Sequence, residues 1–158
     1  MKTKQLTFVF SLLALLLVSV SCDRNRVFDS YVTVPKKGWD KDSLACFKVP
    51  VHSTQQAMNL LVNIRNTQQY PNSNLWLFID VKSPSGKTER DTIECMLADV
   101  NGEWTGKGWG SIFHSSILWK RGVKFAEHGD YEFKVSHGMR SSELQGIQDV
   151  GLRVETVN

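Results

Sequence analysis

The stretches MNLLVNIR at residues 58–65 and LWLFIDV at residues 75–81 decide the fold class. In the first stretch, apolar side chains occupy every second position, an alternation that predicts a strand with one buried face. In the second, aliphatic side chains share one face while Trp76 and Phe78 take the other. A strand that is apolar on both faces is expected in the interior of a sheet.

Alternation with a period of two continues on both sides of these stretches, at residues 45–51, 93–97, 131–135 and 150–154. Turn-forming residues separate the alternating segments. For one such pair, Asn101-Gly102, we expect a type I′ hairpin turn with positive φ at both residues. Pro50 restricts its strand to the edge of a sheet or to a strand end. Residues 139–147 are expected to form one helical turn or a loop.

The whole pattern amounts to about eight or nine short strands with no convincing amphipathic helix. It predicts an all-β fold, a single β-sandwich of jelly-roll or immunoglobulin-like type. No internal repeat and no low-complexity tract interrupts the sequence.

The N-terminus has the three parts of a secretory signal peptide. Lys2 and Lys4 precede an uncharged, mostly apolar run at residues 6–20, and small residues then lead to Cys22. The run is shorter than the roughly 20 apolar residues that span a bilayer. A cysteine directly after the small residues is typical of bacterial lipoproteins, in which Cys22 would become the new N-terminus and carry three fatty acyl chains such as palmitate. The alternative is an ordinary secreted protein.

We therefore expect three regions: a lipoprotein signal peptide at 1–21, a lipidated N-terminus and tether at 22–38, and the sandwich domain at 39–158. Apolar residues within 27–34 indicate that part of the tether pairs as a first strand. Without the signal peptide, 17 basic side chains remain against 16 acidic ones. This near-neutral balance, with no block of like charge, argues against a surface for nucleic acid or anionic lipid.

Two cysteines remain once Cys22 is assigned to lipid. Cys46 and Cys95 both lie in strand-like stretches, and the compartment outside the inner membrane can oxidise thiols. Two outcomes stay open: a disulfide between Cys46 and Cys95, or two buried free thiols that act as small apolar side chains.

No residue pattern points to a metal, a cofactor or catalysis. The histidines lack the spacing with which three or four ligands converge on zinc or iron: His52, His114, His128 and His137. Residues 99–103 (DVNGE) lack the third oxygen ligand and the distal glutamate of a calcium loop. The glycines of residues 106–110 precede no helix, so they suit a twisted strand or bulge better than a phosphate cradle. Serines around His114 lack the Gly-x-Ser-x-Gly context of a nucleophile, and we expect a protein that is not an enzyme.

The tryptophans offer an alternative function. A row of indole rings on the exposed face of a β-sandwich stacks on sugar rings in many carbohydrate-binding modules, so a glycan-binding lipoprotein is the second hypothesis. The five indoles lie on different segments, which favours a structural role between the sheets: Trp39, Trp76, Trp104, Trp109 and Trp119.

Several short motifs resemble those of one known family, the gliding-motility lipoprotein GldH family of the Bacteroidetes. The matching residues are Tyr70-Pro71-x-x-Asn74-Leu75, Pro84-x-Gly86, Asp91-Thr92, Leu97-Ala98-Asp99-x-x-Gly102-x-Trp104-x-Gly106-x-Gly108, Gly129-x-Tyr131, Met139-Arg140 and Leu144-x-Gly146-Ile147-x-Asp149-Val150-Gly151. The resemblance covers nearly the whole chain, most specifically residues 70–151.

The resemblance implies a cell-envelope lipoprotein associated with gliding motility and with the type IX secretion apparatus, without a known cofactor or catalytic activity. Its implied partners are the membrane, through the lipid anchor, and other envelope proteins. Asp23-Arg24-Asn25 after Cys22 lacks the acidic run that resembles a surface-export signal in these bacteria. We therefore expect the domain to face the periplasm.

Overall fold

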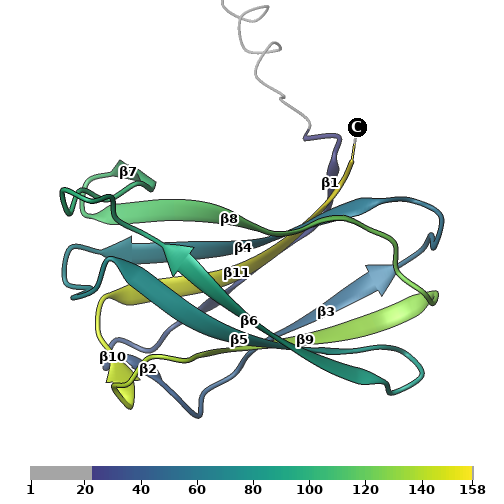
Figure 1. Cartoon of the computed structure of the whole chain (residues 1–158), viewed down its shortest axis with the longest axis horizontal. Helices are drawn as coiled ribbons and strands as arrows, with labels where there is room; N and C mark the ends of the chain where they lie inside the picture. Colours follow the sequence, from purple (N-terminus) through teal and green to yellow (C-terminus); the bar gives the residue numbers. More distant parts are fainter. Residues whose placement is uncertain (1–22, 158) are drawn as a thin grey trace, which may run out of the picture.

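The computed structural model describes residues 23–157, and the elements of this part are strands joined by turns and loops (Figure 1). Within it, no helix is long and apolar enough to cross a membrane. The strands are β1 (Arg26–Thr33), β2 (Trp39–Asp40), β3 (Ala45–Val51), β4 (Met58–Thr67), β5 (Asn74–Lys82), β6 (Thr88–Met96), β7 (Lys107–Trp109), β8 (Ile112–Val123), β9 (Gly129–His137), β10 (Glu143–Leu144) and β11 (Ile147–Thr156).

Two antiparallel sheets form the layers of the sandwich. One has five strands in the order β1-β11-β4-β8-β7, and the other has four in the order β3-β9-β5-β6. A short pair, β10-β2, lies at one end. The all-β prediction is confirmed. The described residues form eleven strands and not eight or nine, because β2, β7 and β10 are only two or three residues long.

Two strands of the four-stranded sheet occupy the positions that their side chains predict. β5, which is apolar on both faces, pairs with β9 on one side and with β6 on the other, so it is an interior strand. β3, which contains Pro50, is an edge strand of the same sheet, as expected for a residue without an N–H to donate.

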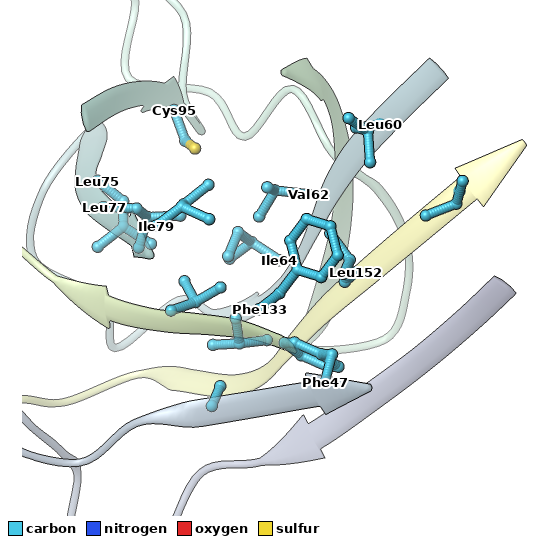
Figure 2. Close-up of a cluster of buried hydrophobic side chains, with 14 of the residues drawn as sticks. Phe47, Leu60, Val62, Ile64, Leu75, Leu77, Ile79, Cys95, Phe133 and Leu152 are labelled. Atoms are coloured by element: carbon cyan, nitrogen blue, oxygen red, sulfur yellow. The ribbon is translucent and has the colours of Figure 1, made fainter. Parts of the chain in front are cut away.

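Inward-facing side chains of both sheets form one continuous core between the layers (Figure 2). Phe47 and Phe133 stand opposite each other on β3 and β9, and Ile64 and Leu152 come from the facing sheet. These four side chains are at most 4% exposed. Burial of alternate residues on each strand therefore holds the two layers together.

The predicted tether is largely part of the folded domain. β1 pairs with β11, with Phe28 opposite Val154 and Tyr31 opposite Gly151. Phe28 and Val32 pack against the core, which explains why this segment is too apolar for a free linker. The sandwich thus begins at residue 26, and three residues, 23–25, lie between Cys22 and the first strand.

Of the helical turn or loop expected at residues 139–147, the structure has the loop, interrupted by β10, whose Leu144 pairs with Trp39. A second local prediction was wrong. In the 99–103 turn, Gly102 has φ +81° but Asn101 does not have positive φ, so the turn is not type I′. The Asp99 carboxylate accepts hydrogen bonds from the N–H groups of Asn101 and Glu103 and closes the loop without a second left-handed residue.

Candidate functional site

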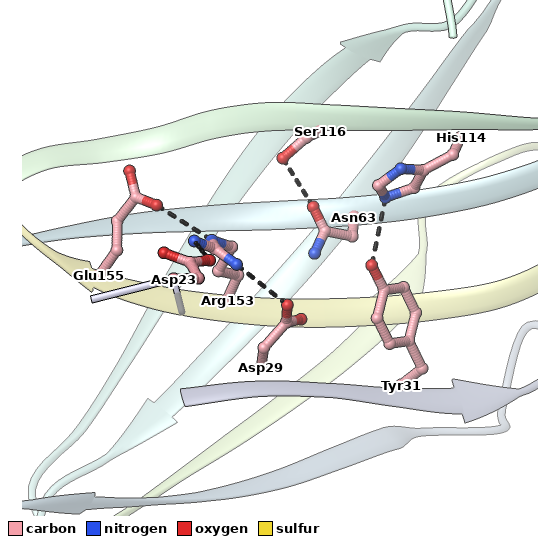
Figure 3. A network of polar contacts seen from close by, with 8 residues as sticks. All are labelled: Asp23, Asp29, Tyr31, Asn63, His114, Ser116, Arg153 and Glu155. Atoms are coloured by element: carbon pink, nitrogen blue, oxygen red, sulfur yellow. Dashed lines mark hydrogen bonds and ion pairs between the residues drawn. The ribbon is translucent and has the colours of Figure 1, made fainter. Parts of the chain in front are cut away.

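A row of polar side chains crosses the outer face of the five-stranded sheet (Figure 3). The hydroxyl of Tyr31 on β1 lies 3.1 Å from Nε2 of His114 on β8. The guanidinium of Arg65 lies over the Tyr31 ring, 4.1 Å from its centroid. Ser116 Oγ donates a 2.7 Å hydrogen bond to Oδ1 of Asn63. This outer-face cluster joins strands that are far apart in the chain.

Gly151 explains how the cluster fits together. Tyr31, Gly151, Asn63 and Ser116 occupy one row across the sheet, in adjacent strands. A Cβ on Gly151 would lie 2.7 Å from Cε1 of Tyr31 and 3.0 Å from Cβ of Asn63. With glycine there, the Tyr31 ring can approach the backbone, and Asn63 is only 1% exposed although it is on the outer face.

We expect Gly151→Ala to lower the free energy of unfolding by about 1–3 kcal/mol, because the added methyl group overpacks the space against Tyr31. The φ of Gly151 is not in the left-handed region, so the cost is steric. Urea unfolding measures it. In a Tyr31→Ala background the cost should largely disappear, and an equal cost in both backgrounds would contradict this account.

The outer-face cluster shows no group poised for acid–base chemistry. Partial burial lowers the pKa of His114 and, first among several causes, raises the pKa of Tyr31. Both groups are therefore neutral near pH 7. Arg65 also lies 3.6 Å from the carboxylate of Asp149, so its charge is matched within the sheet. The side chains bind one another, and the arrangement ties four strands together.

A second polar group, also drawn in Figure 3, fixes the start of the chain. Arg153 on β11 makes ion pairs with Asp23, Asp29 and Glu155. Partial burial disfavours its charge, but hydrogen bonds from the guanidinium to these three carboxylates outweigh that effect and raise its pKa. Asp23 is thereby held against the sheet, directly after Cys22.

A cavity of about 240 Å³ opens between the neighbouring edges of the two sheets, β6 and β8. Aromatic side chains, including Trp119 and Phe133, form its walls. Trp119 Nε1 donates to Asp91 at 2.9 Å, and Lys120 lies 3.3 Å from the same carboxylate. The hydrogen bond from Trp119 is the main cause that lowers the pKa of Asp91. This carboxylate thus serves to hold the two edges together.

The tryptophans do not form a row. Trp39 is 2% exposed, whereas Trp104 and Trp119 are partly buried against the core. Trp76 on β5 is 38% exposed and is the most accessible indole whose side chain the structure describes; nothing is described of the Trp109 side chain. This arrangement favours a structural role for Trp39, Trp104 and Trp119, as side chains that fill space between the sheets.

Trp76 lies on the outer face of the four-stranded sheet, with the half-buried Phe78 on the same strand. Glu94 of β6 is opposite Trp76, and Met96, which is 55% exposed, is diagonal to it. The sulfur of the half-buried Met139 accepts a hydrogen bond from the Trp76 N–H. We call Trp76, Phe78, Met96 and Met139 the Trp76 surface. Aromatic residues and methionine are enriched where proteins bind one another, so this is the candidate interaction surface.

The predicted site residues lie apart. Cys22 is outside the described residues, and its acylation stays a prediction. Among residues 23–157, no three side chains of the metal-ligating types come together. His128 Nδ1 lies 3.1 Å from the His52 carbonyl, but His114 and His137 are in other places, bonded to Tyr31 and to the Trp39 carbonyl.

The histidines should nevertheless make stability depend on pH. Burial lowers the pKa of His137, which is 2% exposed, and also that of His114. Below about pH 6.5 the unfolded chain therefore binds protons that the folded chain does not, so stability falls as pH falls. We expect the free energy of unfolding to decrease between pH 7 and pH 5, as measured by urea unfolding. His137→Gln should flatten this dependence and His52→Gln, at an exposed position, should not; an unchanged slope in His137→Gln would contradict the assignment.

The two cysteines are free thiols on opposite faces of their sheet. Cys46 is exposed, and Cys95 is fully buried in the core, where burial raises the pKa of its thiol to about 12. We expect a thiol reagent to modify Cys46 in the native protein and Cys95 only after unfolding. Mass spectrometry of the labelled chain measures this. No reaction at either cysteine before reduction would indicate a disulfide instead.

The glycines around β7 have a steric role. A Cβ on Gly106 would lie 2.9 Å from the His114 backbone, and one on Gly108 would lie 2.7 Å from the Ile112 carbonyl oxygen. These glycines let the short strand β7 approach β8 closely, in line with the twisted-strand interpretation.

Together these observations define a class: an all-β sandwich with clustered polar side chains on the outer face of one sheet and with Trp76 and Met96 exposed on the outer face of the other. More specifically, the chain belongs to the GldH lipoprotein family, whose model matches residues 26–154. It is 38% identical over 154 residues to "Gliding motility lipoprotein GldH homolog" of Christiangramia forsetii, covering 93% of this chain and 94% of that one. It is 39% identical over 142 residues to "Gliding motility lipoprotein GldH" of Flavobacterium johnsoniae, covering 85% and 87%.

The family expected from the motifs is thus confirmed. It is a family of gliding motility lipoproteins, which implies membrane anchoring in the cell envelope, and it is not a known enzyme family. Among solved structures, the VP2 subviral particle of infectious bursal disease virus aligns over 86% of this chain and 33% of its own, at 13% identity and a TM-score of 0.35. A likeness this low carries no functional argument.

Proposed function

We propose that this protein is a periplasm-facing, non-enzymatic lipoprotein that takes part in gliding motility and in the associated type IX secretion machinery through protein contacts. Membership of the GldH lipoprotein family is the observation that carries the proposal. The absence of an acidic run after Cys22 supports the periplasmic orientation.

The Trp76 surface supports contact with a protein partner. Trp76 and Met96 are exposed on the outer face of the four-stranded sheet, where an apolar partner could bury them. Acyl chains at Cys22 would confine the domain to a membrane and raise its effective concentration beside membrane proteins, so a modest interface suffices.

Site-specific cross-linking in growing cells tests this proposal. A photo-reactive amino acid replaces Met96 at the Trp76 surface, or Thr88 at the other end of the same face of β6 as a control. We expect position 96 to capture a discrete envelope protein, and Trp76→Ser or Cys22→Ala to abolish the capture. Only monomer at position 96, or the same products at position 88, would contradict the proposal.

The exposed indole of Trp76 also keeps the glycan hypothesis open, because one accessible ring can stack on a sugar. Tryptophan fluorescence titrated with sugars distinguishes the two functions. A saturable response that Trp76→Ala abolishes would favour glycan binding, whereas the protein-contact proposal expects no response.

A further inference from the structure

One edge of the four-stranded sheet is β6, a long strand that has a neighbour on one side only. The order β3-β9-β5-β6 leaves the other side of β6 unpaired among the described residues. No proline or glycine interrupts its nine residues, and its register with β5 is continuous. The opposite edge strand, β3, contains Pro50, which has no N–H to donate. β6 is therefore the edge at which a further strand can add to this sheet.

The even-numbered residues of β6 direct their main-chain groups to the unpaired side. Leu97, just after the strand, donates its N–H to the Ser73 carbonyl beside β5. The Thr92 N–H instead donates to the Asp91 carboxylate. Because N–H groups alternate between the two sides of a strand, every second residue of β6 offers its N–H and C=O at the edge. The side chains of these residues lie on the outer face of the sheet, and all of them are exposed.

The side chains of β6 exclude most partner strands but are complementary to a second copy of the same strand. Four of the nine residues are charged, so an apolar strand or one of like charge would bind poorly. Two copies of β6 that run antiparallel about a two-fold axis at Thr92 place Arg90 of each copy opposite Glu94 of the other. Thr92 then lies opposite itself. Pairs of opposite charge and pairs of threonine both stabilise antiparallel strands.

Other registers of the two copies lack this charge complementarity. An axis at Arg90, Asp91 or Glu94 would place like charges opposite each other at the axis, and an axis at Ile93 would pair no charges. With the axis at Thr92, the inner face places Ile93 opposite Asp91 of the second copy. That carboxylate is already bonded to Trp119 and does not need a partner there. The sequence of β6 thus selects a single self-pairing register.

Arg90 and Glu94 both have hydrogen-bonding capacity left for this contact. Arg90 binds Asp80 through Nε and Nη2, at 2.6 and 2.7 Å, and its Nη1 has no partner among the described residues. Glu94 accepts a 2.6 Å hydrogen bond from Asn74, but among residues 23–157 no cation lies within ion-pair distance of it. A guanidinium with free donors and a carboxylate without a cation would therefore meet.

We propose that this protein forms a two-fold symmetric dimer, in which β6 of one copy pairs antiparallel with β6 of a second copy around Thr92. The two four-stranded sheets become one sheet of eight strands. The Thr92 N–H exchanges its local bond to Asp91 for the Thr92 carbonyl of the second copy. Main-chain hydrogen bonds supply the affinity, and the two contacts between Arg90 and Glu94 set the register. The interface is isologous, so the assembly closes at two copies.

The symmetry also suits a protein that is held at a membrane. An axis perpendicular to the joined sheet places both five-stranded sheets on the same side of the dimer. Asp23, directly after Cys22, is ion-paired with Arg153 on the outer face of the five-stranded sheet. Lipids on both copies would therefore reach one bilayer, and both Trp76 surfaces would face away from it. Confinement to the bilayer raises the effective concentration, so a small edge contact suffices.

Disulfide trapping in growing cells tests the register. Cysteine replaces Thr92 at the axis, in a Cys46→Ser background that removes the exposed thiol. Opposed residues of a hydrogen-bonded antiparallel pair have Cα atoms about 5.5 Å apart, which a disulfide spans. The matched control is Thr88→Cys on the same exposed face of β6, whose two copies would lie about 27 Å apart in the dimer. Under mild oxidation we expect severalfold more reducible dimer from Thr92→Cys than from Thr88→Cys.

Charge reversal tests the contact between Arg90 and Glu94. Arg90→Glu or Glu94→Arg alone would place like charges opposite each other, and we expect either change to reduce trapping at position 92 severalfold. Co-expression of the two variants, each with its own epitope tag, should restore trapping as a dimer with one chain of each kind. No dimer from Thr92→Cys, equal trapping from Thr88→Cys, unchanged trapping in the single reversals, or no recovery in the mixture would overturn the inference.

The dimer and the envelope partner of the proposed function are distinguishable by mass. Photo-cross-linking at positions 96 and 88 would in both cases capture a second copy, because Thr88 lies opposite Met96 in this register. The envelope partner is a further product that appears at position 96 alone. Failure of the disulfide test removes the dimer and leaves the proposed function, whereas absence of the further product does the reverse.

Discussion

Replacing Gly146 with alanine is expected to lower the free energy of unfolding by about 4 kcal/mol or more, as measured by urea unfolding. Gly146 has φ +84°, and a Cβ at this position would lie 2.2 Å from the backbone nitrogen of Tyr70. Two effects therefore add: left-handed strain and a collision with main chain that cannot rotate away. Relief would require the 67–70 segment to move, yet Thr67 donates a 2.8 Å hydrogen bond to the Gly146 carbonyl.

Tyr70 makes this movement costly. Its ring is 2% exposed, and its hydroxyl donates a 2.7 Å hydrogen bond to the Asn74 carbonyl just where β5 begins. Displacing Tyr70 would disturb both the start of β5 and the loop that connects β4 to β5. The matched control is Gly102→Ala, with φ +81° and no atom within 4 Å of the added Cβ, for which we expect only the strain of about 1–2 kcal/mol. Similar losses in the two variants would show that the contact with Tyr70 is not the cause.

The sandwich was predictable because its strands are long enough to show which side chains are buried. Alternation over β4 reflects burial of one face, β5 is apolar on both faces because it is an interior strand, and Pro50 marks its edge strand through a missing N–H. The pair β2–β10 could not be predicted, since two residues show no periodicity. The 99–103 turn was misjudged for a different reason: the Asp99 side chain replaces the backbone geometry that an Asn-Gly pair ordinarily adopts.

The surfaces were much less predictable than the core. Tyr31, Asn63, His114 and Gly151 form one cluster only because four strands align in one register, and no motif joins them in the sequence. The only local sign is Gly151, a small residue between Val150 and Leu152 in the middle of a strand.

We expect the second large loss of stability from Phe133→Ala, about 3–5 kcal/mol in the free energy of unfolding. Phe133 is 1% exposed on β9, and its ring meets Trp119 of the facing sheet edge-on, with centroids 6.3 Å apart. The residue also lines the 240 Å³ cavity between β6 and β8, so its removal would enlarge an opening that already exists. The cost combines lost burial with a larger void, since the surrounding strands can collapse only in part. Urea unfolding of the variant measures the loss.

Phe78→Ala is the matched control, because Phe78 lies on the neighbouring strand β5 but on the outer, half-buried face. It should cost about 1 kcal/mol, in proportion to the smaller area that it removes from water. If the two variants lost similar stability, packing between the sheets would not be the main source of stabilisation. The outer face would then contribute more to the free energy of unfolding than its burial accounts for. A loss confined to Phe133→Ala, together with weaker protection of β8 amides from exchange, would locate the stabilising contact at the Trp119 edge of the sandwich.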